Sequence, residues 1–288
     1  MHATLPAVAT PPARTGILGW VARHPLAAFL AWLFTVGQAI AFVPVVFDVP
    51  VPQQVFVVAT SVFGIFLPAL GATWIADGPQ AARRFLRRLV DWRVAAGWYV
   101  LALVVVPLVA VGLAVLLLGA PPALSASVLA DALLSGFVLS FVLTFMPNNW
   151  VEEAAWSGFA QARLQRTHAP VVAALVVGPL FALQHLSLAV GNWIALALLA
   201  VLAIPYRMVT GWVWNRTGSL LVLGLLHAAG NAVASGSGFE GGFLRHLYPD
   251  DASTAGSLHL LAFALVGIVV LVATRGRLGG RRTDDGER

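Results

Sequence analysis

Cysteine is absent from the 288 residues, and charged side chains make up only 10% of them. Without cysteine, the chain forms neither a disulfide framework nor a thiolate metal site, and it has no cysteine nucleophile. A soluble globular domain normally has about a quarter charged residues. The low fraction of charged residues therefore excludes a soluble protein that is surrounded mainly by water.

We also expect no cleaved signal peptide, because no small-residue cleavage site clearly follows the first apolar run. The pI of 10.9 is typical of nucleic-acid-binding proteins. However, the basic residues lie between apolar stretches and at the C-terminal end, which is the pattern of topology signals in membrane proteins. We therefore expect no nucleic-acid partner.

The chain is rich in apolar residues: 59% of its residues are hydrophobic and its mean hydropathy is +0.87. Helices of about 20 apolar residues cross a hydrocarbon core roughly 30 Å thick and satisfy their own backbone hydrogen bonds there. The sequence predicts an all-α polytopic integral membrane protein with about eight transmembrane helices in the lipid bilayer, forming one membrane domain over 1–288 with flexible tails at 1–15 and 275–288. The expected spans are 25–47, 55–76, 95–118, 128–147, 170–190, 192–206, 219–236 and 257–274.

The arginines indicate the orientation of these spans. With the N-terminus in the cytoplasm, eight spans leave only Arg245 on the opposite side, as the positive-inside rule favours. We therefore predict a multi-pass protein of the cell membrane with both termini cytoplasmic. The arginines expected on the cytoplasmic side are Arg83, Arg84, Arg87, Arg88, Arg93, Arg163, Arg166, Arg207, Arg216, Arg275, Arg277, Arg281, Arg282 and Arg288.

The fourth span is unusually long. The stretch 128–166 would measure about 58 Å as one straight helix, far more than a membrane core requires. Pro147, Asn148 and Asn149 interrupt it with a missing amide donor and two residues that favour helix starts. We expect a long helix that is broken near these residues.

Five polar residues lie within the predicted spans or directly after the fourth: Glu152, Glu153, His185, His227 and Asn231. Ionisable side chains are costly in a membrane, so each is a candidate functional residue that needs a partner. His227 and Asn231 are four residues apart and share one helix face. The adjacent glutamates are about 100° apart on a helix, so one is expected to react while the other supports it.

Structural roles compete with these functional ones. An intramembrane histidine is more often a hydrogen-bond partner between helices than a catalyst, and an asparagine at a helix interface is usually a packing contact. His168 and His259 lie near span ends and are interpreted as interfacial. The glutamate pair is harder to explain without a function, and the occurrence of all these residues together favours hydrolysis, in which a carboxylate acts as base and histidine and asparagine stabilise an oxyanion.

The ordered set resembles the three motifs of the CPBP intramembrane protease family, which includes the type II CAAX prenyl endopeptidases. The motifs Glu-Glu-x-x-x-Arg, Phe-x-x-x-His and His-x-x-x-Asn correspond to residues 152–157, 181–185 and 227–231, within a catalytic core expected over 128–236. The resemblance implies a peptide hydrolase whose substrate is a peptide or a lipidated protein. Whether that substrate is prenylated does not follow from it.

The same resemblance implies a role for each motif residue. Glu152 and His185 would polarise the attacking water, His227 and Asn231 would stabilise the oxyanion, and Glu153 would orient the site. Zinc or another divalent metal, held by Glu152, His185 and His227, is compatible with these ligands, and a metal-free glutamate mechanism is the alternative.

Ser157 departs from the first motif, because it occupies the arginine position. A hydroxyl supplies no positive charge to Glu153, and Arg163 is too far along a straight helix to substitute. If the charge matters, Ser157→Arg is expected to raise activity. The departure also keeps a second hypothesis open, that of a degenerate member that acts as a binding or immunity membrane protein without chemistry.

A proton-coupled transporter is the third hypothesis, because buried glutamate and histidine can relay protons. Transport would predict paired broken spans in two halves of the chain, and the sequence has no such repeat.

Overall fold

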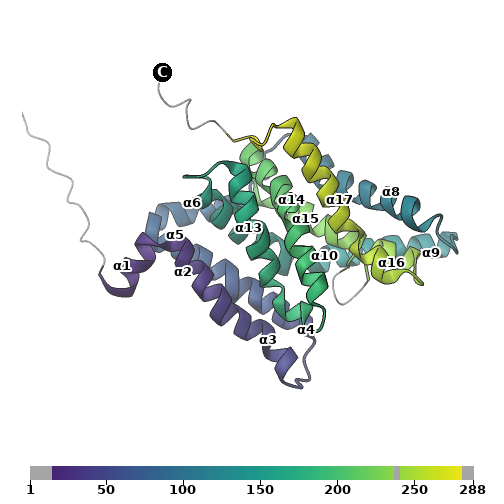
Figure 1. Cartoon of the computed structure of the whole chain (residues 1–288), viewed down its shortest axis with the longest axis horizontal. Helices are drawn as coiled ribbons and strands as arrows, with labels where there is room; N and C mark the ends of the chain where they lie inside the picture. The colour runs from purple at the N-terminus through teal and green to yellow at the C-terminus, as the bar shows by residue number, and fades with distance from the viewer. Residues whose placement is uncertain (1–14, 237–240, 281–288) are drawn as a thin grey trace, which may run out of the picture.

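The computed structural model describes residues 15–236 and 241–280, and within these ranges the secondary structure is helical, with no strand (Figure 1). The predicted all-α fold is confirmed. The predicted tail at 1–15 falls almost wholly outside the described residues, as does 281–288. In the described part of the C-terminal tail, Leu278 is fully buried and packs against Ala174, Met208 and Val270.

The helices follow one another with short connections, and several contain wide π-helical turns. The α-helices are α1 Gly16–Arg23, α2 Pro25–Trp32, α3 Gln38–Val46, α4 Gln53–Ala59, α5 Leu67–Asp77, α6 Pro79–Leu89, α7 Ala96–Val100, α8 Val106–Leu118, α9 Ala126–Asp131, α10 Ser140–Thr144, α11 Trp150–Glu153, α12 Ala162–Leu164, α13 Pro170–Gln184, α14 Trp193–Thr217, α15 Leu220–Val233, α16 Phe243–Leu247 and α17 Ala252–Ala273. The π-helical segments are η1 Leu33–Gly37, η2 Thr60–Phe66, η3 Leu101–Val105, η4 Ala132–Leu139, η5 Phe145–Asn149 and η6 Ala154–Gln161, and η7 Leu186–Ala189 is a 3₁₀ turn.

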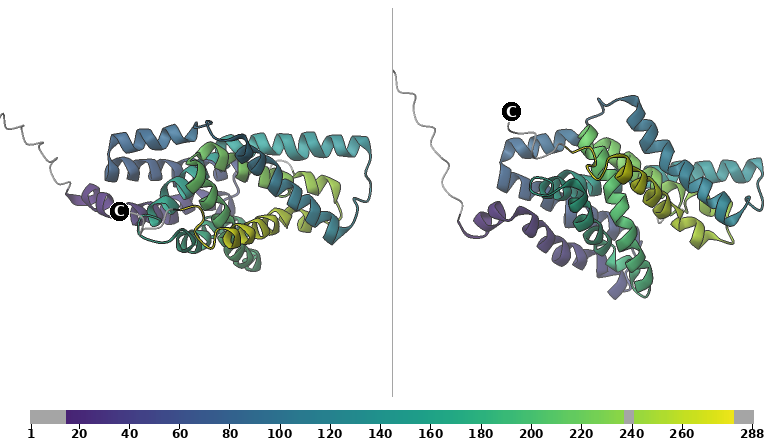
Figure 2. Two further views of the ribbon diagram at one scale, coloured as in Figure 1. Left: turned by 90° about the horizontal axis from the view of Figure 1, so that it is seen from above. Right: turned by 45° about the horizontal axis from the view of Figure 1, so that its top comes forward.

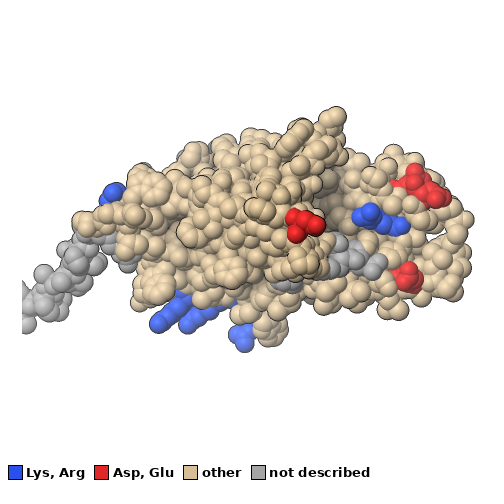
Figure 3. Space-filling view, turned by 90° about the horizontal axis from the view of Figure 1, so that it is seen from below, with Lys and Arg blue, Asp and Glu red and all other residues tan. Residues whose placement is uncertain are grey.

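Six helical stretches in the described residues are long and apolar enough to cross a membrane. Two shorter apolar helices, α13 and α15, join them, so the chain is a multi-pass membrane protein whose apolar helices agree with the predicted number. The six stretches are Pro25–Val46, Gln53–Asp77, Ala96–Leu118, Ala126–Thr144, Trp193–Thr217 and Ala252–Ala273. Figure 3 shows a broad surface with few charged side chains, as expected for a protein in lipid. The cytoplasmic orientation of the termini stays a prediction.

Helices α13, α14 and α15 form the centre of the molecule. In Figures 1 and 2 these green helices lie between the purple helices α2 and α3 and the yellow helix α17. Helix α15 is buried along almost its whole length, which explains why its sequence is apolar apart from His227 and Asn231. Close packing of α13 on α14 depends on Gly178, since a Cβ there would lie 2.8 Å from the Ile204 Cα atom. Small residues permit such close approach between membrane helices.

The long helix predicted around residues 128–166 exists, but it is not broken. Helical structure continues over 126–164, and α-helical and π-helical turns alternate within it. Pro147, Asn148 and Asn149 belong to the π-helical turn η5 and not to a helix cap. A π turn accommodates one extra residue without interrupting the helix, and such turns often occur at functional sites.

The sixth predicted span ends too early. Helix α14 continues to Thr217, where Gly218 adopts the left-handed conformation (φ 63°) that commonly ends helices. Arg207 therefore lies in the middle of a helix and is fully buried, so its predicted place in a cytoplasmic loop is wrong.

Candidate functional site

A cavity of about 490 Å³ brings together residues from all three motifs. Its lining includes Glu152 from α11, His185 directly after α13, and His227 and Asn231 from α15. The three segments are far apart in sequence, and the packing of α11 and α13–α15 brings their side chains to one place. Of the five predicted site residues, Glu153 alone is not part of this lining.

Glu152 is held at the cavity wall by two side-chain amides. Gln184 Nε2 donates to its Oε1 atom at 2.6 Å, and Asn149 Nδ2 donates to its Oε2 atom at 3.5 Å. Gln184 is fixed in turn because its Oε1 atom accepts a hydrogen bond from the Trp156 indole. The long Asn149 contact is a weak hydrogen bond. Oε2 of Glu152 therefore keeps capacity to accept a proton from a group in the cavity.

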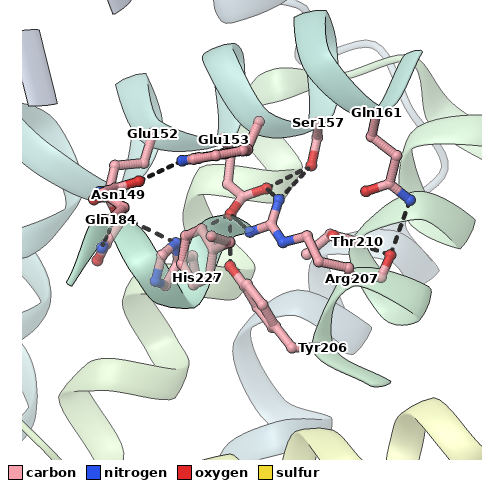
Figure 4. Close-up of polar contacts among 12 residues, drawn as sticks. Asn149, Glu152, Glu153, Ser157, Gln161, Gln184, Tyr206, Arg207, Thr210 and His227 are labelled. Carbon is pink, nitrogen blue, oxygen red and sulfur yellow. Dashed lines mark hydrogen bonds and ion pairs between the residues drawn. The ribbon is translucent and has the colours of Figure 1, made fainter. Parts of the chain in front are cut away.

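Glu153 is fully buried and its two oxygens are saturated with donors (Figure 4). Arg207 donates to both oxygens, from Nη2 to Oε1 at 2.5 Å and from Nη1 to Oε2 at 3.2 Å. Tyr206 donates to Oε1 and Ser157 to Oε2, each at 2.6 Å. A carboxylate with this many donors is a poor proton acceptor. The geometry thus separates the two adjacent glutamates, with Glu152 at the cavity and Glu153 in a buried network.

Arg207 supplies the positive charge that the first motif lacks at Ser157. Its Nη1 atom also donates to the Ser157 hydroxyl at 3.3 Å, so arginine, serine and glutamate form one buried cluster (Figure 4). Glu153 therefore has a charged partner although position 157 is a serine. Arg163 plays no part in this cluster, as expected, and pairs instead with Asp77.

Sequence reasoning missed Arg207 and Tyr206 because the predicted span ended directly before Arg207. Two signals were present in the chain. Asn192 caps α14 by accepting a hydrogen bond from the Ala195 amide, and Gly218 ends it. A helix that starts after asparagine and stops before glycine places Arg207 near its middle, where a membrane helix needs a partner for it.

His227 lies between the cavity and the buried cluster. Its Nδ1 atom is 3.2 Å from Glu153 Oε1 and 3.9 Å from Glu152 Oε2. Edge-on contacts with Tyr206 and Phe181 fix the ring plane. The Nδ1 atom is buried and makes no hydrogen bond within the protein, so the two ring contacts hold the imidazole beside both glutamates at the cavity wall.

His185 was expected in the middle of a span, but α13 ends at Gln184 and His185 is its C-terminal cap. The His185 Nδ1–H donates to the Phe181 carbonyl oxygen at 2.9 Å, since a carbonyl can only accept. This bond selects the tautomer in which Nε2 is an acceptor. His185 can therefore hold a water or a ligand through Nε2.

Asn231, Asn149 and His259 are further polar residues of the lining. Asn231 Nδ2 donates to Asn149 Oδ1 at 3.2 Å, which leaves its second N–H for another acceptor. Asn149 is fully buried, although the sequence suggested only a helix cap at this position. His259 was predicted to be interfacial, but α17 begins at Ala252 and places this histidine on the cavity.

Small residues allow the glutamates to approach the neighbouring helices. Ala154 and Ala155 follow the glutamate pair and are completely buried. Gly224 of α15 contacts the same helix, because a Cβ there would lie 2.9 Å from the Trp150 Cα atom. Glu153 lies on the same helical segment and is likewise 0% exposed.

The predicted metal ligands Glu152, His185 and His227 line the same cavity, but their placement does not fit a metal site. Among the described residues, no three His, Asp or Glu side chains are arranged to hold one ion. Glu152 also uses one oxygen to accept the short hydrogen bond from Gln184. Zinc or another divalent ion stays a prediction, and no step below is assigned to it.

The fold and the cavity together define a class of multi-pass helical membrane proteins in which carboxylate, imidazole and amide groups from separate helices meet in a buried space. Residues 134–233 match the model of the family described as Type II CAAX prenyl endopeptidase Rce1-like. This segment holds all three motifs, so the resemblance inferred from the sequence is confirmed there. No curated protein shows a significant match to the chain.

Proposed function

We propose that this chain is an intramembrane endopeptidase of the cell membrane that hydrolyses a peptide bond in a membrane-associated peptide or a lipidated protein. The observation that carries the proposal is the meeting of Glu152, His185, His227 and Asn231 on one cavity. The match of residues 134–233 to a family of endopeptidases supports the same reaction class.

In the proposed reaction, Glu152 is the general base. A water held by Glu152 and His185 Nε2 gives a proton to the carboxylate, and its oxygen bonds to the peptide carbonyl carbon. Asn231 Nδ2 and the Nε2–H group of His227 donate to the oxyanion of the tetrahedral intermediate. Protonated Glu152 then gives its proton to the departing amide nitrogen as the C–N bond breaks, which returns the carboxylate to its starting state.

Glu153 and Arg207 act as positioning residues in this scheme. Glu153 accepts hydrogen bonds from three side chains and lies 3.2 Å from His227 Nδ1, while Arg207 balances its charge. The alternative of a non-catalytic binding or immunity protein depended on the missing charge at Ser157. Because Arg207 supplies a guanidinium to the same carboxylate, that argument no longer favours it.

The test is hydrolysis by purified protein in detergent of internally quenched peptides that end in a farnesylated CAAX-type sequence, with the same peptides lacking the lipid for comparison. Glu152→Gln is expected to abolish cleavage, by roughly a thousandfold or more, because an amide cannot act as the base. Asp131→Asn is the matched control, since Asp131 is a carboxylate on the same long helix outside the cavity lining. Full activity in folded Glu152→Gln would refute the assignment.

A further inference from the structure

A second cavity, of about 420 Å³, lies between the end of α5, α6, the second half of η6 with the residues that follow it, and α14. It shares no lining residue with the cavity of the candidate site. Its charged lining consists of Asp77 and four arginines, which are Arg84, Arg88, Arg163 and Arg166. Within the part of the chain that the structure describes, this lining leaves three positive charges uncompensated.

Helix α6 turns only some of its arginines toward this cavity. Arg84, Phe85 and Arg88 lie on one helix face and line it, whereas Arg83 and Arg87 lie outside the lining. Spacings of three and four residues place side chains on the same face of a helix. The helix therefore carries two arginines toward the cavity and two away from it.

The opposite wall is built around Arg163. Its side chain is only 10% exposed and pairs with Asp77. Its buried Nε atom has no hydrogen-bond partner in the protein. Arg166 lies 3.6 Å from the same Asp77 oxygen, so two arginines share one carboxylate. The Arg163 guanidinium also lies over the ring of Phe159, 4.7 Å from its centre, and this contact restricts its freedom at this wall.

The third wall holds one of the arginines of α6 in place. The guanidinium of Arg88 lies over the indole of Trp214, 4.8 Å from the ring centre, and Trp214 also lines the cavity. Stacking on an aromatic ring reduces the freedom of the arginine and keeps its N–H groups directed outward from the ring edge. The cavity thus has ordered donors on two sides.

We propose that this cavity binds a phosphate group, supplied by the headgroup of an anionic lipid or by free phosphate. Guanidinium groups match the geometry of phosphate oxygens and bind them with charge-assisted hydrogen bonds. The site lies among the arginines predicted to face the cytoplasm, and α6 is strongly amphipathic, as helices at a membrane surface are. Anionic lipids in that leaflet present phosphates at this level.

The experiment is native mass spectrometry of the whole chain in detergent with added phosphatidate, with phosphatidylcholine as the zwitterionic reference. Wild type is expected to bind one phosphatidate more tightly than phosphatidylcholine. Arg84→Gln with Arg88→Gln should weaken binding at least about tenfold, because charged hydrogen bonds are lost. The matched control, Arg83→Gln with Arg87→Gln, removes the same charge from the same helix and should bind as wild type does.

A second arm adds inorganic phosphate. Displacement of phosphatidate by millimolar phosphate would identify free phosphate as a ligand, and retention of the lipid would identify the headgroup; both outcomes support the site. The proposal would be overturned if both double variants weakened phosphatidate binding equally. It would also be overturned if Arg84→Gln with Arg88→Gln weakened the binding of neither phosphatidate nor phosphate. Glu152→Gln should bind phosphatidate normally, so the result does not depend on whether the chain hydrolyses peptides.

Discussion

Moving an arginine between positions 207 and 157 tests whether both positions serve the same carboxylate. Arg207→Met removes the guanidinium that donates to both oxygens of Glu153. Ser157→Arg alone adds a second guanidinium to a fully buried cluster that contains one carboxylate. Each single variant is therefore expected to lose stability and activity, contrary to the expectation from sequence that Ser157→Arg raises activity. The double variant restores one arginine beside one glutamate.

The magnitude follows from the burial of the pair. Both side chains of the Arg207–Glu153 ion pair are 0% exposed. Removing one partner of such a pair costs about 3–5 kcal/mol, because the other charge is left buried. At about 2–4 °C per kcal/mol for a chain of this size, Arg207→Met should lower the melting temperature by roughly 6–20 °C. The double variant should recover about 2–3 kcal/mol relative to the sum of the single variants.

The assay is thermal unfolding in one detergent for wild type, both single variants and the double variant, with hydrolysis measured on the folded samples. Ser157→Met separates the effect of crowding from that of charge, because it adds bulk without a guanidinium. If the effects of the two single variants add within about 0.5 kcal/mol, the residues share no partner and the reasoning is refuted.

Two further variants test the geometry of the site and of the helix packing. Asn231→Ala should lower kcat about a hundredfold with little change in stability, because an oxyanion donor is lost. The control variant Asn215→Ala, at the end of α14, should retain wild-type kcat. Equal kcat values for the two variants would exclude the proposed role of Asn231 as an oxyanion donor. Gly267→Ala should destabilise the protein by about 1–3 kcal/mol, because a Cβ there would overlap the Pro205 carbonyl oxygen. The control Gly112→Ala places its Cβ in open space and should leave the melting temperature unchanged or slightly higher. A similar loss of stability in both variants would contradict the described packing at Gly267.

Polarity that conflicts with an apolar surrounding made the candidate site residues recognisable in the sequence. Glu152, His185, His227 and Asn231 were recognisable because such residues are rare in membrane helices, and the structure brings them to one cavity. Apolar length likewise predicted the helices, since lipid permits few other structures. Both arguments use properties of single segments, which a sequence displays directly.

The missed features depend on contacts between segments. Arg207 was taken for a loop residue because an arginine at the end of an apolar run is normally a topology signal. Its actual partner, Glu153, is distant in sequence and meets it only after α14 packs beside the glutamate helix. The position of His259 depends on the start of α17 at Ala252, several residues before the first strongly apolar residue. Pairwise contacts of this kind leave no periodic trace in either segment.

The π-helical turn η5 ends shortly before the glutamate pair and determines how this helix responds to the loss of a residue. A π turn is equivalent to one residue inserted into an α-helix, and the wide turn absorbs that residue. Deleting one residue within η5 would therefore close the turn to an α-helical one and leave Glu152 at the cavity. The same deletion in an α-helical turn next to the pair would rotate the glutamates by about 100° and exchange their directions.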